Sequence, residues 1–314
     1  MFSLGIDIGG TNIKAAVVTR QGEILGSAIL ETDAHSGFDA VIRQICRAAE
    51  QASAESQIPL SYIRKAGLAI PGPIGNKKGP VLFAPNINWY QTDPVKPLEE
   101  KWNMPVYLGN DADCMALAEN MCGAGIPFRS FLMLTLGTAV GGALIHEGKL
   151  FTGFGPYGGE LGHIPLCHGG YPCSCGVKGC FEQYGSAEAL KRLAREAMEK
   201  APDSSLWDLC GHNLCDIQPS HVFSAAVLQD KTAVSVLDEF TEYLCEGMAG
   251  LVNIFRPEAV ILGGGLSNAG AALFDLVNEK LPRLTYASEF IPAPPVIQAQ
   301  SCTLSGTIGA ALLE

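Results

Sequence analysis

The chain has 314 residues, of which 47% are hydrophobic and 17% charged, and its formal net charge at pH 7 is −11. This length suits about two domains with cores of their own, and the apolar fraction excludes a disordered chain. The acidic balance argues against nucleic acid or an anionic membrane surface as the main partner, because both need a cationic footprint.

Targeting segments are not evident in the sequence. No stretch approaches 18 consecutive apolar residues, so no membrane-spanning helix is predicted. The N-terminus lacks a basic region followed by an apolar stretch, so no signal peptide is predicted either. Eleven cysteines without an export signal indicate reduced thiols, and we therefore expect a cytoplasmic protein.

Three short apolar runs open the chain, and the glycines between the first two predict a tight turn. A segment with apolar residues at helical spacing follows, and then two further apolar runs. We therefore predict a three-stranded meander, a helix and two more strands, over residues 4–8, 13–18, 24–30, 39–52, 66–70 and 106–108.

The second half of the chain begins like the first. A strand over 131–136, a turn at Gly137–Thr138 and a strand over 141–146 are predicted, and placing Leu4 on Leu132 aligns the two glycine turns. We interpret this as a degenerate internal duplication that produces two lobes, with a chance match of short Gly/Ala/Val strings as the alternative. Further on, we predict a helix over 187–200 capped by Ser186, a helix over 233–255 and a strand over 258–262.

Glycine turns follow three of the predicted strands, at Gly9–Thr11, at Gly137–Thr138 with Gly141, and at Gly263–Gly265. Backbone N–H groups at such turns bind phosphate oxygens, and threonine hydroxyls add donors. No GxxxxGK[ST] string is present, which excludes a P-loop, and the glycine spacing does not fit a Rossmann fingerprint. The three turns predict a nucleotide cleft between two lobes, with ordinary tight turns as the alternative.

Two charged residues flank the first turn. Asp7 ends the first strand, where its carboxylate can hold Mg²⁺ through water. Lys14 follows the turn on the second strand and can face the phosphates. The alternatives are an ordinary turn aspartate and a solvated lysine.

Three cysteines lie close together in a glycine-bearing loop, which we call the cysteine loop (Cys173–Cys180). Thiolates bind Zn²⁺ well, and a closed tetrahedral site needs a fourth ligand. Spacing alone does not decide that ligand, for which the candidates are His163, Cys167 and His168. A site with four protein ligands would be structural, and free or redox-active thiols are the alternative reading.

Polar residues surround this loop in the sequence. Glu160 and His163 are three residues apart and face the same way on a helical turn, and Glu182 follows the last cysteine. If His163 binds zinc through one nitrogen, its other nitrogen can donate to a substrate hydroxyl, and the two glutamates can accept. This set suits a polyhydroxylated ligand, although each carboxylate alone is compatible with an ordinary surface residue.

The chain resembles the ROK family (repressors, open reading frames and sugar kinases) from Asp7 to the C-terminus. The motifs that carry the resemblance are Asp7–Lys14, Pro71–Pro73, Asn110–Asp111, Gly137–Gly142, Glu160–His163, Cys173–Glu182 and Ile261–Gly265. The resemblance implies an α/β fold of the actin-like, ribonuclease-H-like ATPase type, with two lobes and a nucleotide and sugar cleft between them. We expect a smaller N-terminal lobe over 1–112 with a C-terminal helix at 300–314, and a larger lobe over 113–299 that carries the cysteine loop.

The resemblance also implies roles for individual residues. It makes Asp111 the catalytic base for the sugar 6-hydroxyl and implies structural zinc on His163, Cys173, Cys175 and Cys180. The implied sugar-binding residues are Gly72, Asn110, Asp111, Glu160, His163 and Glu182. The residues implied to bind ATP and Mg²⁺ are Asp7, Gly9, Gly10, Thr11, Asn12, Lys14, Gly137, Thr138, Gly141, Gly264 and Gly265. Ala139 stands where glycine is common in the family, which bears on nucleotide affinity.

The function implied is that of an ATP-dependent hexose kinase. Glucose is the first expectation because Cys180–Tyr184 resembles the glucokinase branch, whereas Glu160–Leu166 also resembles allose kinases. Fructose, N-acetylmannosamine and N-acetylglucosamine are further alternatives. We expect a homodimer or homotetramer from the family, and no nucleic-acid or membrane partner.

Two other function classes are the alternatives to a kinase. Repressors of the family carry an additional N-terminal helix-turn-helix domain, whereas here the first phosphate turn begins at residue 9, so we expect no such domain. A sugar-binding protein without catalysis would be expected to lose the base, and Asp111 is present.

Overall fold

The computed structural model describes residues 1–155, 157–300 and 303–314. They form two compact units: unit 1 comprises Met1–Arg129, Ala143–Gly159 and Gln300–Glu314, and unit 2 comprises Ser130–Gly142 and Glu160–Ala299. Within the described part of the chain, no helix has both the length and the apolar character that crossing a membrane requires.

The first sheet has the strand order β3-β2-β1-β4-β7. Strands β1, β2 and β3 pair antiparallel, which confirms the predicted meander, and β1, β4 and β7 run parallel. A small antiparallel hairpin, β5–β6, follows β4 and was not predicted. The strands of unit 1 up to this point are β1 (Phe2–Ile8), β2 (Asn12–Thr19), β3 (Ile24–Glu31), β4 (Ile63–Ile70), β5 (Val81–Ala84), β6 (Trp89–Thr92) and β7 (Val106–Asn110).

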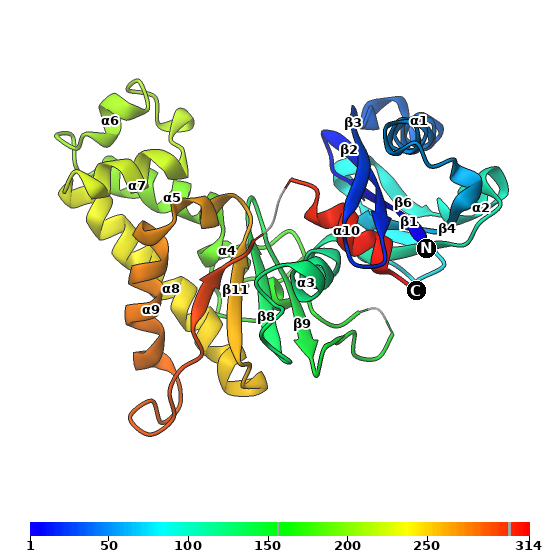
Figure 1. Cartoon of the computed structure of the whole chain (residues 1–314). Coiled ribbons are helices and arrows are strands. Elements are labelled where there is room, and N and C mark those ends of the chain that lie inside the picture. The colour runs from blue at the N-terminus through cyan, green and yellow to red at the C-terminus, as the bar shows by residue number, and fades with distance from the viewer. Residues whose placement is uncertain (156, 301–302) are drawn as a thin grey trace. The chain divides into compact units, whose positions relative to one another are not determined.

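Four helices accompany this sheet. Helix α1 packs on β2 and β3, and the C-terminal helix α10 packs on β1, β4 and α3, as the red helix beside the blue strands in Figure 1 shows. Gly5 and Gly67 make that close packing possible, because a side chain at either position would collide with the α10 backbone. The bounds are α1 (Phe38–Ser56), α2 (Val95–Trp102), α3 (Asp111–Cys122) and α10 (Ser305–Leu312). Helix α10 is thus shorter than the predicted helix 300–314, of which residues 301–302 lie outside the described residues.

The second sheet has the strand order β10-β9-β8-β11-β12, in which β8, β11 and β12 run parallel. The strands are β8 (Phe131–Leu136), β9 (Val140–His146), β10 (Lys149–Leu150), β11 (Ala259–Gly263) and β12 (Val296–Gln298). Both five-stranded sheets therefore place a strand–turn–strand unit beside two parallel strands, which agrees with the interpretation of an internal duplication.

Helices gather around the long helix α8, which packs against α5, α7 and α9 (Figure 1). The predicted cap of α5 is confirmed, because the Ser186 hydroxyl accepts a hydrogen bond from Ala189 N at 3.2 Å. The helices of unit 2 are α4 (Glu182–Gly185), α5 (Ala187–Met198), α6 (Leu206–Leu209), α7 (Pro219–Val227), α8 (Lys231–Phe255) and α9 (Ala271–Leu284). Short 3₁₀ turns lie at Ala34–Ser36, Leu60–Tyr62, Pro85–Ile87, Leu161–His163, Leu214–Asp216 and Gly265–Ala269.

Candidate active site and metal centre

The carboxyl ends of β1, β4 and β7 meet at one edge of the first sheet. Asp7 is paired in register with Ala69, and Ile70 is paired with Asn110. The turn after β1, Gly72 after β4 and Asp111 after β7 therefore emerge at the same edge of unit 1. In α/β sheets this edge is where ligands bind, because loops and helix N-termini converge there.

Asp7 and Lys14 face each other across the β1–β2 pair, with Lys14 Nζ 3.4 Å from Asp7 Oδ2. Burial raises the pKa of Asp7, because the charged carboxylate loses water, and the charge and hydrogen bond of Lys14 partly offset that rise. The first turn thus has one acidic and one basic group at its base. The acidic group can bind a metal ion, and the basic group can bind a phosphate.

The first glycine turn is closed by Gly9 N, which donates to Asn12 O at 2.9 Å. Thr32, the buried residue that directly follows β3, holds this turn in place. Its hydroxyl donates to Gly9 O at 2.6 Å, and its N–H donates to Thr11 O at 2.9 Å. Gly10 and Thr11 remain exposed. Thr32 was missed in the sequence, since it has no motif and only its tertiary contacts show its role.

Asn110 and Asp111 form the N-terminus of α3. Asn110 is the N-cap and its Oδ1 accepts from Ala112 N at 2.8 Å, while Asp111 is the first helical residue and is exposed. A carboxylate in the first turn of a helix lies at the positive end of the helix dipole, which favours its charged form. The structure thus places an exposed carboxyl group at the edge where the parallel strands end.

Gly72 follows β4 with φ of 151°, a backbone conformation that favours glycine. A side chain here would also collide with the carbonyl of Phe83 on β5. The hairpin that sequence analysis missed therefore presses against Gly72. Asn86, in the connection between β5 and β6, also lies near Gly10, since a side chain at Gly10 would meet Asn86 O at 3.1 Å.

The equivalent edge of the second sheet carries the other two glycine turns. Gly263 of β11 is in register with Thr135 of β8, so the two turns follow neighbouring parallel strands. Gly137 N donates to Ala139 O at 3.0 Å, which closes the first of these turns, and Gly264 adopts a φ of 81°. Thr138, Ala139, Gly264 and Gly265 are exposed, while Gly141 on β9 is half-buried.

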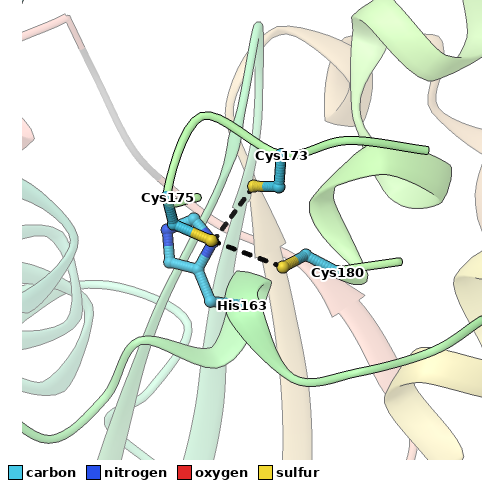
Figure 2. Close-up of side chains that lie close together, drawn as sticks. All are labelled: His163, Cys173, Cys175 and Cys180. Carbon is cyan, nitrogen blue, oxygen red and sulfur yellow. Dashed lines mark hydrogen bonds between the residues drawn. The ribbon is translucent and has the colours of Figure 1, made fainter. Parts of the chain in front are cut away.

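Four side chains converge in unit 2 to form a candidate metal centre (Figure 2), and their ligand atoms all lie within 4.8 Å of one another. His163 Nδ1 lies 3.6 Å from Cys173 Sγ, and Cys175 Sγ lies 3.5 Å from Cys180 Sγ. Sulfur atoms around a tetrahedral zinc are about 3.8 Å apart, given a Zn–S bond of about 2.3 Å. The donor set and its spacing therefore fit Zn²⁺.

The backbone of the cysteine loop brings these thiols together. Cys173 N donates to Val177 O at 2.8 Å and Gly176 N to Cys173 O at 3.0 Å, with Gly176 in the left-handed region at φ of 92°. Of the three residues that spacing left open as the fourth ligand, His163 joins the cluster. The cluster found among the described residues includes neither Cys167 nor His168.

The thiols also show why a cation suits this loop. Burial, together with the neighbouring thiols, raises the pKa of Cys180 to about 12, and burial likewise raises the pKa of Cys173. Three adjacent thiolates would repel one another without a positive charge. A divalent cation reverses this balance by stabilising the deprotonated form.

Two glutamates lie beside the candidate metal centre. His163 Nε2 is 4.0 Å from Glu160 Oε2, so one ring nitrogen faces the thiols and the other faces a carboxylate. Glu182 is buried, and its Oε1 lies 3.5 Å from Cys173 Sγ and 3.4 Å from Gln183 Nε2. A metal on Nδ1 would fix the proton on Nε2, as in other carboxylate–histidine–metal arrangements.

The predicted site residues are therefore grouped by unit. Unit 1 brings together the first glycine turn, Asp7, Gly72, Asn110 and Asp111. Unit 2 brings Glu160 and Glu182 to the metal centre and the two other glycine turns to the edge of its sheet.

Comparison with known proteins identifies relatives along the whole chain. A model of the ROK family matches residues 3–314. The glucokinase of Thermotoga maritima is 34% identical over 309 residues, which are 98% of this chain and 95% of that protein. A xylose repressor of Caldicellulosiruptor bescii is 28% identical over 291 residues, which are 91% of this chain and 71% of the repressor.

A solved structure shows the same fold. The ROK family glucokinase of Streptomyces griseus, in complex with glucose and AMPPNP, aligns with a TM-score of 0.85 and 33% identity. The alignment covers 100% of this chain and 99% of that one. The predicted two-lobed, actin-like ATPase fold is thereby confirmed.

Proposed function

The chain belongs to the ROK family, and on that premise we propose that it is an ATP-dependent hexose kinase that phosphorylates the 6-hydroxyl of the sugar. The observation that carries the proposal is the position of Asp111. It is exposed in the first turn of α3, at the edge of the sheet that also carries Asp7 and the first glycine turn.

The proposed chemistry follows from this arrangement. Asp111 accepts the proton of the sugar 6-hydroxyl as that oxygen attacks the γ-phosphorus in line. Phosphoryl transfer passes through a loose transition state, so placement of the base matters more than a tuned pKa. Backbone N–H groups of the glycine turns and Lys14 stabilise phosphate charge, and Asp7 would hold Mg²⁺, which neutralises charge on the transferring group.

The sugar would be held by hydrogen bonds to its hydroxyls. We assign this role to Gly72, Asn110 and Asp111 in unit 1 and to Glu160, His163 and Glu182 in unit 2. His163 Nε2 would donate to a hydroxyl, while the glutamates would accept. Zinc on His163 Nδ1 and the three thiols would hold the imidazole in that orientation, and this zinc would be structural because all four positions are protein ligands.

Glucose is the sugar we propose, because both the Thermotoga maritima and the Streptomyces griseus relatives are glucokinases. Allose, fructose, N-acetylmannosamine and N-acetylglucosamine are the alternatives. The experiment is a coupled assay of ADP release with each of these sugars and mannose. A clear kcat/KM preference for another hexose would replace glucose, and ADP release with none of them would refute the kinase and favour sugar binding of the repressor type.

Asp111→Ala tests the proposed base. General-base catalysis contributes about 10²–10⁴-fold, so we expect kcat to fall by about three orders of magnitude while the variant folds normally. Asp39→Ala is the matched control, because Asp39 is likewise an exposed carboxylate in the first turn of a helix, α1. Turnover by Asp111→Ala at the rate of the control would contradict the assignment.

We also propose that the protein acts in the cytoplasm as a homodimer or homotetramer, with the hexose and ATP as its partners. Light scattering coupled to size-exclusion chromatography measures the assembly directly. A monomer at micromolar concentration would refute that part of the proposal.

A further inference from the structure

A buried carboxylate near the end of α3 takes no part in the proposed chemistry. Glu119 is 1% exposed, and its Oε2 accepts hydrogen bonds from two backbone N–H groups, Ala124 N at 2.7 Å and Gln300 N at 3.1 Å. Charged side chains are seldom fully buried unless they have specific partners. The position of these two partners in the chain indicates what the carboxylate does.

Both partners belong to unit 1 and lie near points where the chain passes to or from unit 2. The first segment of unit 1 ends at Arg129, five residues beyond Ala124, and its last segment begins at Gln300, with Ala143–Gly159 between them in the sequence. The turn at Gly148 joins the same region, because Gly148 N donates to Arg129 O and Asn120 Nδ2 lies 3.4 Å from Gly148 O. Connecting segments from distant parts of the sequence thus meet at the C-terminal end of α3.

The opposite end of α3 carries Asp111. The helix has 12 residues, which corresponds to about 18 Å at 1.5 Å per residue. It also packs against α10. One rigid element therefore joins the proposed base to the connecting segments.

We propose that Glu119 is a positioning residue: by holding the segments at Ala124 and Gln300 on the C-terminal end of α3, it fixes this helix within unit 1 and thereby the place of Asp111 at its N-terminus. This inference rests on the proposed kinase function. Charge-assisted hydrogen bonds to a shared oxygen tie Ala124 and Gln300 to one point. Fixed points at this end of the helix limit how far it can shift, and a shift of the helix would displace the proposed base, whose exact placement controls the rate.

A substitution at Gly123 provides a second, independent way to disturb the Glu119 carboxylate. A side chain added at Gly123 would occupy the place of the Glu119 carboxylate, so Gly123→Ala must displace it without removing it. Glu119→Leu removes both acceptors at similar volume. Glu119→Gln keeps one oxygen and loses only the charge, and serves as the conservative variant. The control is Glu188→Gln, an exposed carboxylate on α5.

Hydrogen exchange of the Ala124 and Gln300 amides is the first measurement, and it needs no turnover. We expect exchange at these two amides to rise at least tenfold in Glu119→Leu and Gly123→Ala, to rise less in Glu119→Gln, and to stay unchanged in the control. Unchanged exchange in both Glu119→Leu and Gly123→Ala would overturn the proposal. If Glu119→Leu does not fold, Gly123→Ala and Glu119→Gln decide the question.

The second measurement is the ratio of ADP formed without hexose to ADP formed with it. A change in the folded fraction cancels in this ratio, so a purely structural role leaves it constant. We expect a rise of about tenfold in Glu119→Leu, a smaller one in Glu119→Gln, and none in the control. A constant ratio alongside faster exchange would overturn the positioning role, whereas wild-type protein without hexose-dependent ADP release would refute the proposed function instead.

Discussion

Cys175→Ser is the most direct test of the candidate metal centre. Cys175 is exposed, so serine replaces it without leaving a cavity, and the substitution removes one of the four proposed zinc ligands. The remaining three ligands keep the loop geometry but no longer close a tetrahedral site. We therefore expect zinc affinity to fall and the stability of unit 2 to fall with it.

The size of the effect follows from binding linkage. If losing one ligand weakens zinc affinity 100-fold, the stabilisation lost is about 2.7 kcal/mol. Unit 2, Ser130–Gly142 with Glu160–Ala299, has about 150 residues. For a domain of that size each kcal/mol shifts Tm by about 2–4 °C. The expected fall in Tm is therefore about 5–10 °C.

Elemental analysis of the purified protein and thermal melting are the assays. Wild type is expected to hold one zinc per chain and to melt at lower temperature after chelation, and Cys175→Ser to resemble the chelated protein. Cys215→Ser is the control, because Cys215 is exposed and lies outside the cluster. Full zinc content and an unchanged Tm in Cys175→Ser, or wild type without zinc, would refute the reasoning.

Two further predictions concern unit 1. Lys14→Met removes the charge that offsets burial of Asp7, so we expect the pKa of Asp7 to rise further. The Asp7 carboxyl then binds its proton more tightly in the folded form than in the unfolded form, so the free energy of unfolding falls as pH rises from about 4 towards neutrality. Carbon NMR titration measures the pKa of Asp7, and urea unfolding at several pH values measures the free energy. An unchanged pKa of Asp7 in Lys14→Met would contradict the pairing. Gly67→Ala drives a methyl into the Ala310 backbone of α10; we expect about 1–3 kcal/mol lower stability by urea unfolding, and wild-type stability would contradict the close packing.

The fold was largely predictable from local pattern. Apolar runs and glycine turns indicated the strands of both sheets, because buried strands need such runs and tight turns need backbone freedom. The hairpin β5–β6 was missed, since Val81–Thr92 mixes apolar, polar and proline residues without a clear period. Helix α3 was also missed as an element, because its apolar residues surround most of the helix.

The amino-acid sequence was enough to indicate the candidate ligands and polar groups: three cysteines in one short loop, an Asn–Asp pair after a strand, and glycine turns after three others. These are properties of residue type and local spacing. Which of these residues lie together depends on the tertiary structure. It selected His163 over Cys167 and His168, because the fourth ligand depends on how the chain before the loop folds back. It also brought Thr32 to the first turn and Glu119 to Gln300, contacts across 23 and 181 residues that no local pattern encodes.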